Sequence, residues 1–139
     1  MATVIRAEIS NNNKYWIDKH RHYELKHFCL QYPYWKERYK ILGVPSITPT
    51  IMEHVPNGDQ HGDPTARFAL QKTYYAERIN MIERIAEETD QYLASYILKA
   101  VTEGLSYTYL KTRLKIPCSR DMYYDRYRKF FWMLSKARK

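Results

Sequence analysis

Apolar residues recur every three or four positions along most of the chain, which is the spacing of amphipathic helices. From Lys14 to about Gln31 this spacing predicts a helix with a broad aromatic face, preceded by a polar turn of three asparagines. Pro33 interrupts that helix but suits the first turn of a second one, which we expect to end at Gly43. The pattern therefore predicts an N-terminal helical pair, residues 1–42.

The helical period is lost over residues 43–63, where prolines and glycines accumulate. A loop of about 20 residues is unusual inside one compact domain, so we interpret this stretch as a long linker or exposed loop. It separates the N-terminal module, 1–42, from a helical domain at 64–139. Asp63 as a cap and Pro64 in the first turn predict where the helical domain begins.

A long central stripe of alanine, isoleucine, leucine and tyrosine then continues to Val101. It predicts either one long helix or two helices broken near residues 87–90, where Thr89 or Asp90 would cap the second. Gly104 is expected to end this region. A stripe of this length fits packing within one chain and equally the seam of a homodimer.

Residues 90–136 have the sequence features of three consecutive helices. Ser106 is predicted to cap a short second helix over residues 107–114. Ser119 is predicted to cap a longer third helix that reaches about residue 138. The short helix and the long one are joined by a tight turn, which is the arrangement of a helix-turn-helix.

The expected turn contains Ile116 as an apolar plug and Pro117 as the residue that stops the short helix. The side chains expected to face the core are Leu105, Tyr109, Leu110, Leu114, Met122, Tyr123, Tyr127, Phe130, Phe131 and Leu134. The predicted fold class is therefore all-α: an N-terminal helical pair, a long linker, a long central helix or helix pair, and a C-terminal tri-helical helix-turn-helix.

The net charge of +8 is concentrated at one end of the chain. Residues 106–139 contain ten basic and two acidic residues, so this segment alone carries a charge equal to the whole excess. A concentrated positive field favours a polyanion as partner: DNA, RNA or an anionic membrane. The alternative interpretation is a solvated basic surface that has no partner.

In a helix-turn-helix, the first turns of the last helix reach base edges in the major groove, while the preceding helix and the turn contact phosphates. Arg120 and Arg128 suit guanine edges or phosphates, and Tyr124 suits a phosphate or a thymine methyl group. Asp121 and Asp125 are expected on the same outward face. The predicted DNA-binding residues are Ser106, Thr108, Lys111, Arg113, Lys115, Ser119, Arg120, Asp121, Tyr124 and Arg128.

Four short motifs follow one another in the chain: LQYPYW at 30–35, GDPT at 62–65, IERI at 82–85, and the helix-turn-helix pattern between 96 and 131. In this order they resemble phage late-gene transcriptional activators of the RinA/ArpU type, whose C-terminal unit is similar to the promoter-binding region 4 of sigma factors. The resemblance spans roughly residues 24–136. It implies a DNA-binding activator from a phage or prophage of a low-GC Gram-positive host, with host RNA polymerase as a further partner.

Other chemistries find little support in the sequence. His20, His22, His27 and Cys29 suggest a zinc cluster, but His20 and His22 lie about 200° apart on one helix. We interpret these residues as a solvated basic helix face. No nucleophile with a paired base and no glycine-rich phosphate loop stands out. The sequence therefore predicts no enzymatic activity, no cofactor and no metal.

The two cysteines are isolated, no N-terminal run resembles a signal peptide, and no apolar segment approaches about 20 residues. We therefore expect a soluble cytoplasmic protein, associated with the host nucleoid and without a membrane partner. The leading hypothesis is a sequence-specific transcription regulator that binds double-stranded DNA. Two alternatives stay open: a helical adaptor that binds a protein, and a phage DNA-packaging subunit with the same helix-turn-helix.

Overall fold

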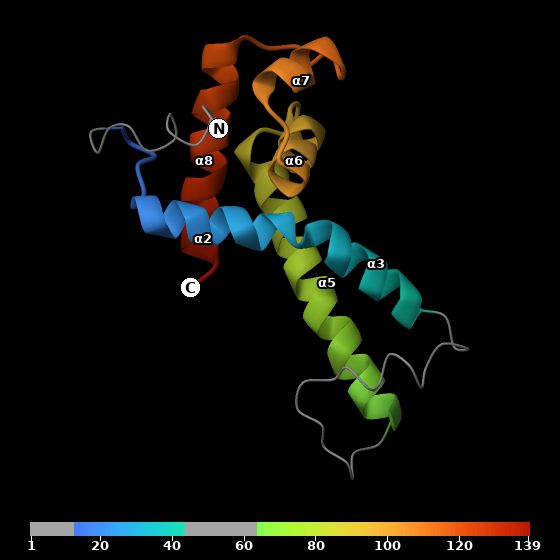
Figure 1. The fold of residues 1–139 in the computed structure, drawn as a ribbon. Helices are drawn as coiled ribbons and strands as arrows, with labels where there is room; N and C mark the ends of the chain where they lie inside the picture. Colours follow the sequence, from blue (N-terminus) through green and yellow to red (C-terminus); the bar gives the residue numbers. More distant parts are fainter. Residues whose placement is uncertain (1–12, 44–63) are drawn as a thin grey trace. The chain divides into compact units, whose positions relative to one another are not determined.

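The computed structural model describes residues 13–43 and 64–139, and every regular element within these ranges is a helix. The helices are α2 (Lys19–Leu30), α3 (Tyr32–Leu42), α5 (Pro64–Thr89), α6 (Ala94–Glu103), α7 (Tyr107–Thr112) and α8 (Arg120–Ala137) (Figure 1). The predicted all-α class is confirmed. The predicted linker and the predicted cap Asp63 lie outside the described residues. None of the helices in the described ranges has both the length and the apolar character needed to traverse a bilayer.

The chain divides into two compact units. Unit 1 comprises the described residues of Met1–Gln31 and of Met81–Lys139, and unit 2 comprises those of Tyr32–Asn80. The sequence placed the first two helices in one N-terminal module, whereas α2 packs against α6 and α8 within unit 1. The reason is that the apolar period of α2 shows that one face must be buried but does not identify the helices that bury it.

The start of α2 is determined by a single side chain. The Asp18 carboxylate accepts hydrogen bonds from the amides of His20 and Arg21, which have no partner inside the helix. Asn13 instead forms a separate turn, in which its Oδ1 atom accepts from the Tyr15 amide at 2.8 Å. The prediction that the helix starts directly after the asparagines is therefore wrong.

Of the two arrangements left open for the central stripe, the structure has the broken one, since α5 and α6 are separate helices. Asp90 holds the turn between them: its Oδ1 atom accepts from the amides of Tyr92 at 2.9 Å and Leu93 at 3.2 Å. Thr89 does not cap the second helix. Its hydroxyl donates to the Ile85 carbonyl at 2.7 Å, within α5.

Five of the described helices contribute to the core of unit 1. Leu25, Ile82, Ile97, Leu110 and Phe130, one from each of α2, α5, α6, α7 and α8, are all 0% exposed. Full burial of a large apolar side chain stabilises the fold by about 1.5–3 kcal/mol. Figure 1 shows α2 lying across α8, with which it is in contact. The first described helix of the chain is thus held against the last.

A row of aromatic rings runs along the inner face of α8. The ring centroids of Tyr107 and Tyr123 are 5.6 Å apart, those of Tyr123 and Tyr127 6.0 Å, and those of Tyr127 and Phe131 5.0 Å. The row ends at His22 of α2, whose ring lies edge-on to Phe131 at 4.9 Å. His22 is 1% exposed and Cys29 0%, so the prediction that these two belong to a solvated basic face is wrong. Each such ring pair adds about 0.5–1.5 kcal/mol beyond simple burial.

The last turn of α8 is capped by a cation from α2. The Arg21 guanidinium donates from Nε to the Ser135 hydroxyl at 3.1 Å, and from Nη2 to the carbonyls of Ser135 and Arg138. These carbonyls have no amide partner further along the helix and carry partial negative charge. Arg21 therefore satisfies the end of α8 and strengthens the contact between the two helices.

Unit 2 consists of α3 and the part of α5 up to Asn80. Trp35 of α3 and Tyr75 of α5 are buried within the described structure. The Lys72 ammonium of α5 lies 5.3 Å from the centroid of the Tyr39 ring of α3, which places these two helices side by side at this point. The predicted stop of α3 at Gly43 is confirmed, since the helix ends at the residue before it.

Candidate nucleic-acid interface

The predicted site begins where α6 ends and the short helix α7 starts. Gly104 has a φ angle of 69°, in the left-handed region, and the amides of Gly104 and Leu105 both donate to the Ala100 carbonyl. Ser106 then accepts a hydrogen bond from the Tyr109 amide at 3.1 Å. Gly104 as the stop and Ser106 as the cap are thus confirmed.

A left-handed residue, rather than a proline, reverses the chain after α7. The helix ends at Thr112, and Lys115 has a φ angle of 59°. This conformation turns the chain so that the Ile116 amide donates back to the Leu110 carbonyl at 3.0 Å. Ile116 is 1% exposed, so its predicted role as the plug is confirmed. α7 thus ends before the predicted Leu114, and Lys115 has turned the chain before Pro117 is reached.

Two hydrogen bonds fix the first turn of α8. Ser119 accepts from the Met122 amide at 3.2 Å, which confirms the predicted cap. The Tyr107 hydroxyl, from the start of α7, donates to the Cys118 carbonyl at 2.7 Å. Cys118, the residue before the cap, is therefore tied directly to α7. This bond holds the start of α8 against the start of α7.

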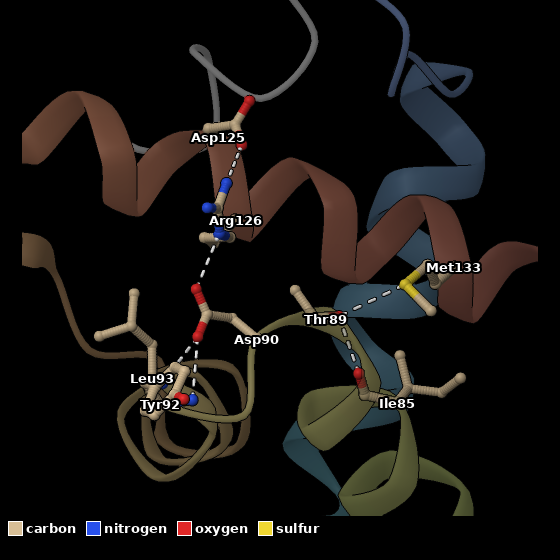
Figure 2. A network of polar contacts seen from close by, with 8 residues as sticks. All are labelled: Ile85, Thr89, Asp90, Tyr92, Leu93, Asp125, Arg126 and Met133. Atoms are coloured by element: carbon tan, nitrogen blue, oxygen red, sulfur yellow. Dashed lines mark hydrogen bonds and ion pairs between the residues drawn. The ribbon is translucent and has the colours of Figure 1, made fainter.

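The second turn of α8 is tied to the turn between α5 and α6 (Figure 2). Arg126 donates from Nε to Asp90 Oδ2 at 2.9 Å and from Nη1 to Asp125 Oδ2 at 2.5 Å. The Asp90 side chain is only 13% exposed and that of Arg126 28%. Asp125, predicted to lie on the outward reading face, is therefore occupied by this ion pair.

The same contacts shift the acidity of the groups around the turn. Burial acts to raise the pKa of Asp90, but hydrogen bonds from Arg126 and from the amides of Tyr92 and Leu93 outweigh it, and the pKa lies below its usual range. The hydrogen bond to Asp90 likewise raises the pKa of Arg126. Burial, together with the Asp90 carboxylate, raises the pKa of the Cys118 thiol. Asp90 and Arg126 are thus both charged, and Cys118 is a neutral thiol.

Most of the predicted DNA-binding side chains lie on the surface. The exposed ones are Ser106, Thr108, Lys111, Arg113, Lys115, Ser119, Arg120 and Asp121. Ser106 and Ser119 already accept a backbone amide as caps, and their hydroxyl hydrogens stay available to an acceptor such as a phosphate oxygen. α7, the turn and the first residues of α8 therefore each supply exposed polar side chains.

The remaining two predicted residues are less accessible. Tyr124 is 5% exposed, and its ring lies 5.1 Å from Tyr123 in an edge-on arrangement, so the prediction that it faces outward is wrong. Tyr123 and Tyr124 are adjacent and both buried, so the buried face of α8 is wider here than a simple helical stripe implies. Arg128 is half-buried, and its Nε atom is buried without a hydrogen-bond partner.

Two side chains that the sequence placed in the core belong to the surface. Met122 is 43% exposed and Tyr109 44% exposed. Both fit the apolar period, so nothing in the sequence marks them as exposed. Only the positions of the neighbouring helices decide which side of α7 and which side of α8 are covered.

Arg120 is exposed but makes a contact within unit 1. Its guanidinium carbon lies 5.1 Å from the centroid of the Tyr107 ring. A cation at this distance is attracted to the ring face by about 0.5–1 kcal/mol at an exposed site. The side chain predicted to read guanine thus points back over α7.

Uncompensated positive charge lies on α7 and the turn. We call Lys111, Arg113 and Lys115 the cationic cluster; all three are exposed. Among the cations of residues 106–139, all of them described, only Arg126 forms an ion pair. The cationic cluster thus presents three charges to solvent, one on α7 and two on the following turn, whose backbone is fixed by hydrogen bonds.

Comparisons with protein families, with curated proteins and with solved structures found no match to this chain. The case for a function therefore depends on the geometry and charge of the interface itself.

Proposed function

We propose that the chain is a sequence-specific DNA-binding transcription regulator, in which α7, the turn and α8 act as a helix-turn-helix. The observation that carries the proposal is the cationic cluster, Lys111, Arg113 and Lys115, held without ion pairs on a fixed turn beside the start of α8. In this arrangement α8 enters the major groove with its first turns, and the cationic cluster contacts the phosphates on the groove edge.

The hydrogen bonds around the turn support this role. Recognition of a groove requires a helix whose direction is fixed before DNA arrives, because ordering it on binding would cost free energy. Tyr107, Ser119 and the Asp90–Arg126 pair fix the first two turns of α8 in this way. The proposal is of a binding protein without catalytic chemistry, acting in the host cytoplasm on nucleoid DNA.

The motif order described above leads us to propose further that the regulator is of the phage late-gene activator type, with host RNA polymerase as a second partner. A homodimer is part of the same proposal, since operators with two half-sites are read by two-fold symmetric proteins.

The experiment that tests the proposal compares two variants of equal net charge. The first replaces the cationic cluster with glutamine: Lys111→Gln, Arg113→Gln and Lys115→Gln. The control replaces three exposed lysines elsewhere, Lys14→Gln, Lys19→Gln and Lys40→Gln. Binding to a fluorescent random duplex is measured over a series of salt concentrations.

We expect the cluster variant to bind the duplex weakly. The negative slope of log K against log salt should become less steep by about 3, roughly 0.9 for each phosphate that is no longer neutralised. The control variant keeps the wild-type slope. Equal weakening in the two variants would mean that only the net charge of the chain matters, and no duplex binding by the wild type at low salt would remove the proposal.

A second candidate function is a helical adaptor that binds a protein. Large exposed side chains favour it, since Tyr92 is 82% exposed, Leu70 71% and Tyr34 55%. Tyrosine is enriched in protein interfaces. Binding of a protein that persists in high salt, with no retention of duplex DNA in low salt, would favour this function. A DNA-packaging subunit shares the proposed interface and is distinguished by loss of packaging, not of transcription, in the cluster variant.

A further inference from the structure

We propose that Asp121 and Met122, rather than Arg120, distinguish the base pairs, and that the preferred duplex offers a cytosine amino group to Asp121 and a thymine methyl group to Met122. This inference depends on the proposed function, because it concerns the same surface. The sequence instead led us to expect that arginine contacts with guanine recognise the base pairs.

The structure leaves few side chains free in the first two turns of α8. Tyr124 is buried, and Asp125 is bound to Arg126. Arg120 lies over the Tyr107 ring at 5.1 Å. Asp121 and Met122 are both exposed and adjacent, so they are the side chains that this end of the helix presents to a groove.

Asp121 has the chemistry to read one base. It is exposed and forms no ion pair with any described residue, although the cationic cluster lies on the preceding helix and turn. A carboxylate brought near phosphates is repelled, and a hydrogen bond that it accepts offsets this repulsion; in the major groove the donor suited to Asp is the N4 amino group of cytosine. A first-turn acid also favours the helix end electrostatically, but that effect does not depend on the base.

Met122 has the chemistry to read a second base. Its side chain is 43% exposed, while the large apolar side chains that follow it on the inner face of α8 are buried. The only apolar group that a base pair offers in the major groove is the thymine C5-methyl group. An unbranched thioether adapts to such a contact without a fixed pocket.

The test begins with selection of preferred sites from random duplexes by the full-length chain, which we expect to yield a cytosine next to a thymine. Deoxyuridine in place of that thymine removes only the methyl group. It should weaken binding by the wild type about fourfold, because one methyl group is no longer buried, and leave Met122→Ala unaffected. Met122→Leu, which keeps the apolar volume, should retain the deoxyuridine effect.

Asp121→Asn tests the other contact. It should reduce discrimination against replacement of the cytosine by roughly tenfold or more, while binding to unrelated duplexes becomes tighter because a repulsive charge is gone. Both positions are exposed, so the variants fold, and their helical circular dichroism provides the check. Arg120→Ala is the matched control and should keep the wild-type base preference.

The outcomes separate this inference from the proposed function. Loss of base preference in Arg120→Ala, with preference kept in Asp121→Asn and Met122→Ala, would overturn the inference and leave DNA binding in place. Duplex binding by the wild type with no base preference would overturn the inference and the sequence specificity in the proposed function, and would leave only general DNA binding. Absence of any duplex binding would overturn both.

Discussion

The imidazole of His22 is buried among aromatic rings, with its Nε2 atom lacking a hydrogen-bond partner. Tyr127 and Phe131 of α8 and Tyr23 of α2 surround it, and the Lys26 ammonium on the same helix acts on it electrostatically. Burial, with a smaller effect of the Lys26 ammonium, lowers the pKa of His22 from 6.5 to about 4. The ring is therefore neutral in the folded protein at neutral pH.

This burial predicts a loss of stability in mild acid. Between the unfolded pKa of 6.5 and the folded pKa of about 4, His22 binds a proton in the unfolded chain but not in the folded one. Unfolding is therefore favoured as the pH falls. From pH 7 to pH 5 the loss should be about 2 kcal/mol. Urea unfolding at the two pH values measures it. His22→Gln should remove this part of the pH dependence, whereas exposed His20→Gln should keep it; an unchanged dependence in His22→Gln contradicts the assignment.

Lys115 combines a strained backbone with a charge proposed to bind phosphate. Its φ angle of 59° costs a residue with a Cβ atom about 1 kcal/mol relative to glycine. Lys115→Gly should therefore be about 1 kcal/mol more stable than Lys115→Ala in urea unfolding. Both variants lose the same charge, so both should weaken duplex binding to the same extent. Equal stabilities would show that the left-handed conformation is not maintained in solution.

The turn between α5 and α6 is an element held by one carboxylate with two functions. One oxygen of Asp90 accepts the amides of the turn, and the other accepts Arg126 of α8. Asp90→Asn keeps an oxygen for the amides but loses the charge, so it should cost about 1 kcal/mol. Asp90→Ala loses both functions and should cost about 2 kcal/mol.

The same substitutions made together with Arg126→Met separate these two functions of Asp90. In Arg126→Met the ion pair is already absent, so Asp90→Asn should add no further loss, whereas Asp90→Ala should still cost about 1 kcal/mol for the turn. The free energies of unfolding of the single and double variants form the required cycle. Additive losses for Asp90→Asn and Arg126→Met would mean that the two side chains do not interact.

The elements that the sequence predicts correctly are those set by neighbours along the chain. Ser106, Ser119 and Gly104 act within one turn of helix, and each has the predicted role. The wrong predictions concern which face of a helix is buried. The apolar period placed Met122 inside and Tyr124 outside, but the packing of the other helices leaves Met122 exposed and buries Tyr124.

Contacts between distant residues were also outside the reach of the pattern. Asp90 and Arg126 are 36 residues apart, and neither is unusual among its neighbours. His22 lies within a run of basic residues that is typical of a solvated face, yet α8 covers it. The predicted caps of α7 and α8 and the predicted helix end at Gly104, which depend on neighbouring residues, are thus confirmed, and the predictions of which side chains are buried are wrong where they depend on packing between helices.

For the molecule as a whole, the contact of α2 with α6 and α8 means that the last three helices do not have a complete core of their own. Leu25 and Cys29 are 0% exposed and Phe28 5%, so α2 contributes several buried side chains to unit 1. Removal of one large buried side chain typically costs about 2–5 kcal/mol, and the stability of a small domain is only about 5–15 kcal/mol. Loss of the whole helix therefore exceeds what the remaining core can supply.

This argument predicts the behaviour of a fragment cut at the boundary that the sequence suggested. Residues 64–139 alone should unfold without a cooperative transition in urea and should lose the near-ultraviolet circular dichroism of the aromatic row, because α8 is then without His22 and Leu25. A synthetic peptide of residues 13–31 added in excess should restore both signals, and the same peptide carrying Leu25→Ala should restore them less. If the fragment unfolds cooperatively at the midpoint of the full chain without the peptide, residues 64–139 form an independent domain and α2 is not needed for its core.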